Sequence, residues 1–285
     1  MARTKTRNGV AYDPAALDRV EQRFWRDIWD SVPPDQASEH GLELRRFGGI
    51  QAQVVTDLAR AGFLNLILGA AEADGTRDLA AAVEWSLARG VRPYVPVTPE
   101  LPGSAAAEEW LRGNGFERGY AWMKFVRDAH PPRFKVPDLE VVELSDPEQA
   151  PFGMVAAAGF SMYPWAAAFF ANLPGREGWR CYVAIVDGEA QACAAMVIEG
   201  GIAEFGIAAT LEGARGRGCQ LALLHRRIVD AAAAGCHTLF VETGERVPDR
   251  PSISYRNILR AGFEEAYLRP NWMIGGGGAP PPTSG

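Results

Sequence analysis

Apolar and polar residues alternate along the chain in two patterns, one typical of amphipathic helices and one typical of strands. Leu17, Val20, Phe24 and Ile28 lie on one face of a helix expected over residues 15–30. Later in the chain, apolar runs predict strands at 181–186, 190–198 and 203–209, and shorter helices at 153–160 and 164–172. Asp187-Gly188-Glu189 and Gly200-Gly201 lie between the expected strands and are typical of hairpin turns.

The chain also repeats one order of elements: helix, strand, helix, Gly-Phe turn, strand. One constant spacing separates Gly90 from Gly235 and Thr98 from Thr243. A second constant spacing relates Gly115-Phe116 to Gly262-Phe263, and each of these glycines fits the left-handed end of a helix. We interpret the pattern as two copies of one plan. The expected fold class is α/β, with two tandem domains that each have a twisted mixed sheet flanked by helices.

The expected boundaries follow from this repeat. Residues 1–126 form the first domain and 139–274 the second, with a proline-rich linker over 127–138. The glycine- and proline-rich stretch 275–285 is expected to be a disordered tail.

Composition narrows the function classes. The chain has 285 residues and a net charge of −6, and it shows no Lys/Arg run, which argues against a nucleic-acid partner. No apolar stretch approaches the roughly 18–20 residues of a membrane span, and the N-terminus lacks the apolar core of a signal peptide, so we expect a cytoplasmic protein. The four cysteines and four histidines form no ligand cluster, so no metal is expected, and buried reduced thiols are favoured.

The most informative stretch is 212–224, Glu-Gly-Ala-Arg-Gly-Arg-Gly-Cys-Gln-Leu-Ala-Leu-Leu. A basic, glycine-rich turn there follows an expected strand and opens an expected helix. Backbone N–H groups, Arg215, Arg217 and the positive end of a helix would meet at one point, where a pyrophosphate binds well. The alternative is an ordinary charged surface turn.

These residues resemble the pyrophosphate loop of the GNAT acetyltransferase superfamily, Arg/Gln-x-x-Gly-x-Gly/Ala. Arg215 and Gly218 match the pattern, whereas Gln220 departs from its final small position. Leu259-Arg-Ala-Gly-Phe263 resembles the superfamily's later helix and its Gly-Phe turn. The likeness covers residues 139–274, while residues 12–126 share only the layout and resemble a degenerate copy.

The resemblance implies acetyl-CoA as the donor. Ile207, Ala208 and Ala209 would hold the pantetheine arm through their backbone, in a V-shaped opening between this strand and the next. Ser254 and Asn257 would add polar contacts to the arm. The pyrophosphate would lie on the loop residues Arg215, Gly216, Arg217, Gly218, Cys219 and Gln220.

The first copy lacks such a loop. Its counterpart, residues 70–78, has one glycine and three acidic residues, which would repel a pyrophosphate. We therefore expect one cofactor site in each chain.

Three residues are candidates for the chemistry. Glu242 matches a strand glutamate that is the base in ribosomal-protein N-terminal acetyltransferases, and Glu204 lies on the strand that leads to the loop. The alternative for Glu242 is a solvated carboxylate at a strand end. Ile258 occupies the position of the superfamily's usual proton-donating tyrosine, so Tyr255, close to one helical turn earlier, is the candidate donor.

The implied reaction is acetyl transfer to a small-molecule or amino-acid-like amine, with no nucleic-acid or membrane partner. An aromatic set, Phe160, Tyr163, Trp165, Phe169 and Phe170, lines the acceptor pocket or belongs to the core. The alternatives are a CoA-binding regulatory or scaffold protein that has lost catalysis and a transferase for a longer acyl-CoA. The sequence does not decide the oligomeric state.

Overall fold

The computed structural model describes residues 4–7, 9–72, 76–146, 151–247 and 252–275. The expected disordered tail, apart from Gly275, lies outside the described residues. In the N-terminal half the elements are β1 (Lys5–Arg7), β2 (Val10–Tyr12), α1 (Pro14–Ser31), α2 (Pro34–His40), β3 (Leu42–Phe47), β4 (Ile50–Val55), β5 (Ile67–Leu68), α3 (Arg77–Leu87), β6 (Val95–Pro96), α4 (Ser104–Gly113) and β7 (Phe116–Arg127).

The C-terminal half adds six strands and four helices among the described residues. They are β8 (Glu140–Leu144), α5 (Phe152–Gly159), α6 (Ala168–Ala171), β9 (Trp179–Val186), β10 (Glu189–Glu199), β11 (Ile202–Thr210), α7 (Cys219–Ala233), β12 (Thr238–Gly244), α8 (Ile253–Arg260) and β13 (Glu264–Ile274). Short 3₁₀ turns precede α6 and α7. The mixed α/β class and the repeated order of elements are confirmed.

A single eight-stranded mixed sheet runs through both halves, in the order β6-β13-β7-β12-β11-β10-β9-β8. β7 comes from the N-terminal half but lies between β12 and β13 and is antiparallel to both. In return, β13 from the C-terminal half pairs with β6. The two halves therefore exchange their last strands and share one sheet, and a division after residue 126 cuts β7 one residue before its end.

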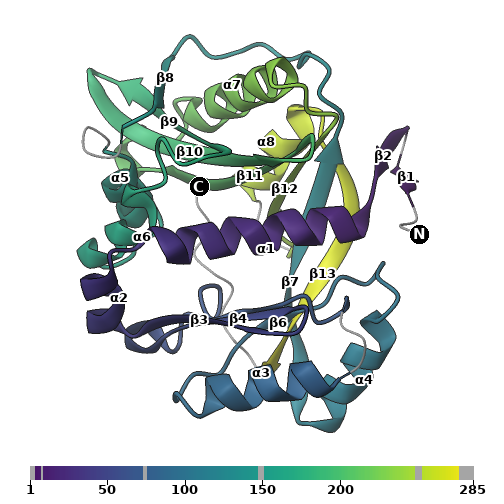
Figure 1. The fold of residues 1–285 in the computed structure, drawn as a ribbon. Helices are drawn as coiled ribbons and strands as arrows, with labels where there is room; N and C mark the ends of the chain where they lie inside the picture. The colour runs from purple at the N-terminus through teal and green to yellow at the C-terminus, as the bar shows by residue number, and fades with distance from the viewer. Residues whose placement is uncertain (1–3, 8, 73–75, 147–150, 248–251, 276–285) are drawn as a thin grey trace.

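The N-terminal half has a smaller antiparallel sheet of its own, β3-β4-β5, which a parallel bridge between Leu66 and Tyr94 links to the start of β6. Helix α1 lies between this small sheet and the large one (Figure 1). Asp13 caps α1 by accepting a hydrogen bond from the Ala15 N–H, and Pro14 occupies its first turn. The apolar stripe predicted for this helix is buried, and so are Asp18, Glu21 and Gln22 beside it.

The core divides at the large sheet. One cluster packs the α1 and α5–α6 side, including Phe24, Ile28 and Phe169. A second packs the α7–α8 side, including Phe205, Ile258 and Phe263. All four cysteines are buried and free, which confirms the expectation. None of the described helices is long and apolar enough to cross a membrane.

Candidate active site

A fork in the large sheet lies at the centre of the candidate site. β11 and β12 run parallel and pair from Ile202–Thr238 to Phe205–Val241, and beyond that point the pairing stops. Ile207 has a φ of 47°, which a β-branched residue adopts only under strain, and the register with β10 shifts at the same level. The bulge turns β11 away from β12, so the V-shaped opening expected here is present.

The glycine-rich loop follows directly from the wide end of this fork. After β11 ends at Thr210, Gly216 and Gly218 have φ values of 79° and 89°, where only glycine is free of strain. Helix α7 then begins at Cys219, and no side chain among the described residues caps it. Its first N–H groups are therefore available to an anion.

The loop lines a cleft to which other parts of the chain contribute. Lys135, Asp138 and Arg260 join Arg215 and Arg217 in its lining. Pro137 of the expected linker lies beside Gly218. Arg217 forms an exposed ion pair with Asp187 of the β9–β10 turn, with an Nη1–Oδ2 distance of 2.5 Å. A ligand on the loop would compete with Asp187 for Arg217 but not, among the described residues, for Arg215.

Gln220 is directed toward α8 and holds the two residues expected beside the pantetheine arm. Its Nε2 donates to Ser254 Oγ at 2.9 Å, and Asn257 Nδ2 donates to its Oε1 at 2.8 Å. Gln220, which replaces the small residue of the superfamily's loop pattern, therefore joins α7 to α8 next to the fork. Gln220 and Ser254 both line the cavity described below.

A cavity extends from the fork to the N-terminal half, and mostly apolar side chains surround it. The expected aromatic set divides: Phe160 and Phe170 line the cavity, Phe169 is in the core, Trp165 stacks on His40, and Tyr163 is 64% exposed. The N-terminal half supplies further walls, which include Phe24, Trp25, Ile28, Phe63, Leu64, Leu66 and Tyr120.

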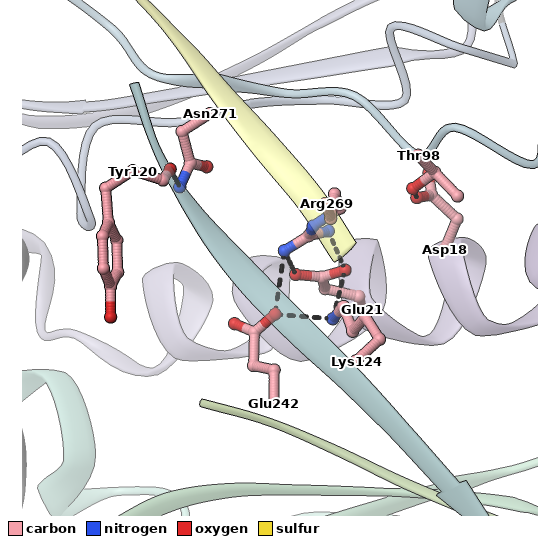
Figure 2. A network of polar contacts seen from close by, with 8 residues as sticks. All are labelled: Asp18, Glu21, Thr98, Tyr120, Lys124, Glu242, Arg269 and Asn271. Atoms are coloured by element: carbon pink, nitrogen blue, oxygen red, sulfur yellow. Dashed lines mark hydrogen bonds and ion pairs between the residues drawn. The ribbon is translucent and has the colours of Figure 1, made fainter. Parts of the chain in front are cut away.

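A buried network of four charges joins the halves beside this cavity (Figure 2). Glu21 of α1 accepts hydrogen bonds from both Nη atoms of Arg269 and from Lys124 Nζ at 2.9 Å. Glu242 binds the same two cations, at 2.8 Å from Lys124 Nζ and 2.9 Å from Arg269 Nη2. Burial alone would raise the pKa of Glu21, but Arg269 and Lys124 hold it at about 2.

Glu204 is the carboxyl group of the cavity without a close cationic partner among the described residues. It is 5% exposed, and its Oε2 has no hydrogen-bond partner there. Burial raises its pKa well above the ordinary glutamate value, an effect that Lys124 opposes and that Glu21 and Glu242 reinforce. Of the two candidate bases, Glu242 is bound by two cations, whereas Glu204 has no ion pair among the described residues.

Tyr255 is in a different place from the one expected. Its hydroxyl donates to Glu265 Oε1 at 2.6 Å, and its ring packs on Phe125 in the α7–α8 core. It is not among the described residues that line the cavity, whereas Ile258 is. This position argues against the expected role of Tyr255 as proton donor, because its hydroxyl is bound to Glu265 and its side chain does not line the cavity.

Sequence reasoning missed Glu21, Lys124 and Arg269. Lys124 and Arg269 each interrupt an apolar strand, and Glu21 lies beside the apolar stripe of α1, so charges at inward positions were the available signal. In the N-terminal half, Glu72 occupies part of the segment that corresponds to the loop and pairs with Arg19 at 3.5 Å. Burial, Asp18 and Asp13 raise its pKa to about 7. No phosphate cradle is seen in the described part of that segment.

Solved structures match this architecture over nearly the whole chain. A GCN5-related N-acetyltransferase from Kribbella flavida superposes with a TM-score of 0.60 at 16% identity, over 93% of this chain and 96% of that one. One from Sphaerobacter thermophilus gives 0.55 at 15% identity, over 96% and 94%. A protein described as a tandem GNAT protein from the clavulanic acid biosynthesis pathway gives 0.53 at 15%, over 91% and 96%.

No family model matches the sequence, and no curated protein matches it. At these identities the structural likeness establishes the fold, which is that of the GNAT acetyltransferases.

Proposed function

We propose that this protein is an acetyl-CoA-dependent N-acetyltransferase that acts on a small amine. One observation carries the proposal: the fork between β11 and β12 leads without interruption to the Gly216–Gly218 turn and the uncapped start of α7. An extended donor with a pyrophosphate at one end and a thioester at the other fits this order of features.

The residues present suit such a donor. The N–H groups from Gly216 to Gln220 and the side chain of Arg215 would hold the pyrophosphate. The free edge of β11 at Ile207, Ala208 and Ala209 would hold the pantetheine arm, with Ser254 and Asn257 beside it. Cys219 and Arg217 complete the loop, and Lys135 and Arg260 add positive charge to the same cleft. Bound acetyl-CoA would supply the activated thioester.

The acceptor amine would enter through the cavity on the α1 side of the fork. Phe24, Trp25 and Phe170 would contact an apolar or aromatic body, since these rings surround the space next to Gly206. Glu204 would accept the proton that the attacking nitrogen loses, because its raised pKa makes it a stronger base than an exposed glutamate. Glu242, bound to Lys124 and Arg269, would fix the polar end of the cavity.

The test is thiol release from acetyl-CoA by the full chain with a panel of primary amines that range from aliphatic to aromatic. The proposal expects turnover that saturates with at least one apolar amine. CoA binding without turnover of any amine would instead support the alternative of a regulatory or scaffold protein. Turnover with a longer acyl-CoA alone would support the other alternative.

A further inference from the structure

Arg227 is a buried cation that the site described so far does not use. It lies on α7, is 1% exposed, and lines the cavity at the fork. Its Nε donates to the Leu223 carbonyl at 3.2 Å and its Nη1 to the Ala195 carbonyl at 3.0 Å. Both acceptors are neutral, and no carboxylate among the described residues lies within ion-pair distance of the guanidinium.

The ionisable groups that act on Arg227 provide no negative charge. They are Tyr182 of β9 and Cys193 of β10. Burial raises the pKa of Cys193 to about 12 and raises that of Tyr182 as well, so both are neutral over the working range. Burial also lowers the pKa of Arg227, to about 10, and the guanidinium therefore stays charged at neutral pH. A buried charge of this kind is costly unless an anion accompanies it at some stage.

The position of Arg227 indicates when in a reaction an anion would lie next to it. Its guanidinium lies 4.6 Å over the ring of Phe205, which belongs to the last pair of residues before the fork opens. Neighbouring residues of a strand face opposite sides of a sheet, so Glu204 faces α1 while Phe205 faces α7. Among the described residues, the fork thus has carboxyl groups on its acceptor side and a cation without an ion pair, Arg227, on the side of α7 and Ile258.

We propose that Arg227 stabilises the thiolate that leaves when the acyl group is transferred, in place of a proton donor at position 258. The inference rests on the proposed function. The bond between nitrogen and the carbonyl carbon forms, and the bond from that carbon to sulfur breaks. Sulfur leaves with the electron pair as a thiolate next to Arg227, while Glu204 takes the proton from nitrogen. The bound thioester is neutral, so the charge of Arg227 favours the transition state over the ground state.

The test measures the thiol pKa of CoA bound to the full chain, from the ultraviolet absorbance of the thiolate across the neutral and alkaline range. Acetyl-CoA, which has no thiol, gives the baseline. In the wild type the bound thiol should ionise at lower pH than free CoA. Arg227→Met should raise the pKa of the bound thiol by at least about one unit, which is a tenfold loss of preference for the thiolate. Arg227→Lys should retain part of the effect.

Arg226→Met is the matched control, because this neighbouring arginine pairs with Asp230 and Glu143 away from the fork. The kinetic readout is a fall in kcat of about 10²–10³ in Arg227→Met at unchanged KM for acetyl-CoA. The inference is overturned if the variants still bind CoA and turn over, but the pKa of the bound thiol is the same in the wild type, in Arg227→Lys and in any Arg227→Met protein that folds. Failure of the wild type to bind CoA overturns the proposed function itself.

Discussion

Glu21 on α1 and Arg269 on β13 are joined by two hydrogen bonds, at 2.5 and 2.7 Å, although 248 residues separate them in sequence. The pair lies between the halves of the chain, next to the cavity, and Lys124 of β7 shares the same carboxylate. The first helix of the chain is thereby fixed to the two strands that the halves exchange.

Glu21→Gln should destabilise the protein by about 3–5 kcal/mol, because it leaves Lys124 and Arg269 buried with only Glu242 as an anion. Urea unfolding followed by circular dichroism measures the change. Glu39→Gln on the exposed surface of α2 is the matched control and should stay within about 0.5 kcal/mol of the wild type. Equal unfolding free energies for both variants would contradict the assigned role of the network.

The same carboxylate predicts a pH dependence of stability. Its folded pKa of about 2 lies below the ordinary value of 4.5, so the unfolded chain binds the proton more readily. This contribution to stability should be complete above about pH 4.5 and should be lost as the pH falls toward 2. Unfolding midpoints across this range should show a smaller decline in Glu21→Gln than in the wild type.

Glu204 changes stability with pH in the opposite direction from Glu21. Its folded pKa is raised, so the folded state holds the proton more tightly, and this group lowers stability progressively as the pH rises above the ordinary value of 4.5. Glu204→Gln should remove that decline and be at least as stable as the wild type at neutral pH. It should also lower kcat/KM for the amine by about 10²–10⁴ and remove the acid limb of the pH profile. A wild-type profile in this variant would exclude Glu204 as the base.

Gly206 sets the room available to the acceptor. A Cβ at this position would lie 2.4 Å from the ring of Phe24, so Gly206→Ala should push that ring into the cavity. We expect the KM for the amine to rise severalfold while the dissociation constant of CoA is unchanged. Combining it with Phe24→Leu should restore the KM, and a KM that stays high would show that the ring does not border the acceptor.

Arg215 tests the loop without disturbing the fold, because its side chain is exposed. Arg215→Glu should weaken CoA binding at least about tenfold, as a charge-assisted contact becomes a repulsive one. Arg60→Glu, on an exposed turn of the N-terminal half, should leave the affinity unchanged. Gly218 is less suitable as a test, since a side chain there would also collide with Pro137. Equal affinities in titration calorimetry would place the pyrophosphate elsewhere.

The order of elements could be predicted because it depends on local signals. Gly115-Phe116 and Gly262-Phe263 each end a helix in the left-handed region and begin a strand, and the structure has both turns. The exchange of β7 and β13 could not be predicted in this way, because a strand's local pattern does not specify which distant strand it pairs with. β7 and β13 each follow the Gly-Phe turn of their own half, and nothing in their own residues indicates that β7 pairs with β12 or that β13 pairs with β6.

The candidate site likewise has a part that local sequence predicts and a part that it does not. Ile207, Gly216 and Gly218 follow one another in sequence, so a local motif was enough to place the donor end. Lys124 was missed because an isolated cation in an apolar segment has no motif, and Arg227 because nothing local distinguishes it from its neighbour Arg226; the surroundings of both depend on residues from other elements. Tyr255 shares a helix face with Ile258, but its contacts with Glu265 and Phe125 come from other elements, so its surroundings could not be predicted from spacing on the helix.

The most direct measurement is a crystal structure of the full chain with CoA. One molecule of CoA should be bound in each chain, with its pyrophosphate on the N–H groups from Gly216 to Gln220 and its arm between β11 and β12. The sulfur should lie at the fork beside Arg227. A molecule bound in the N-terminal half, or a fork that stays closed to CoA at millimolar concentration, would contradict the donor site assigned to this chain.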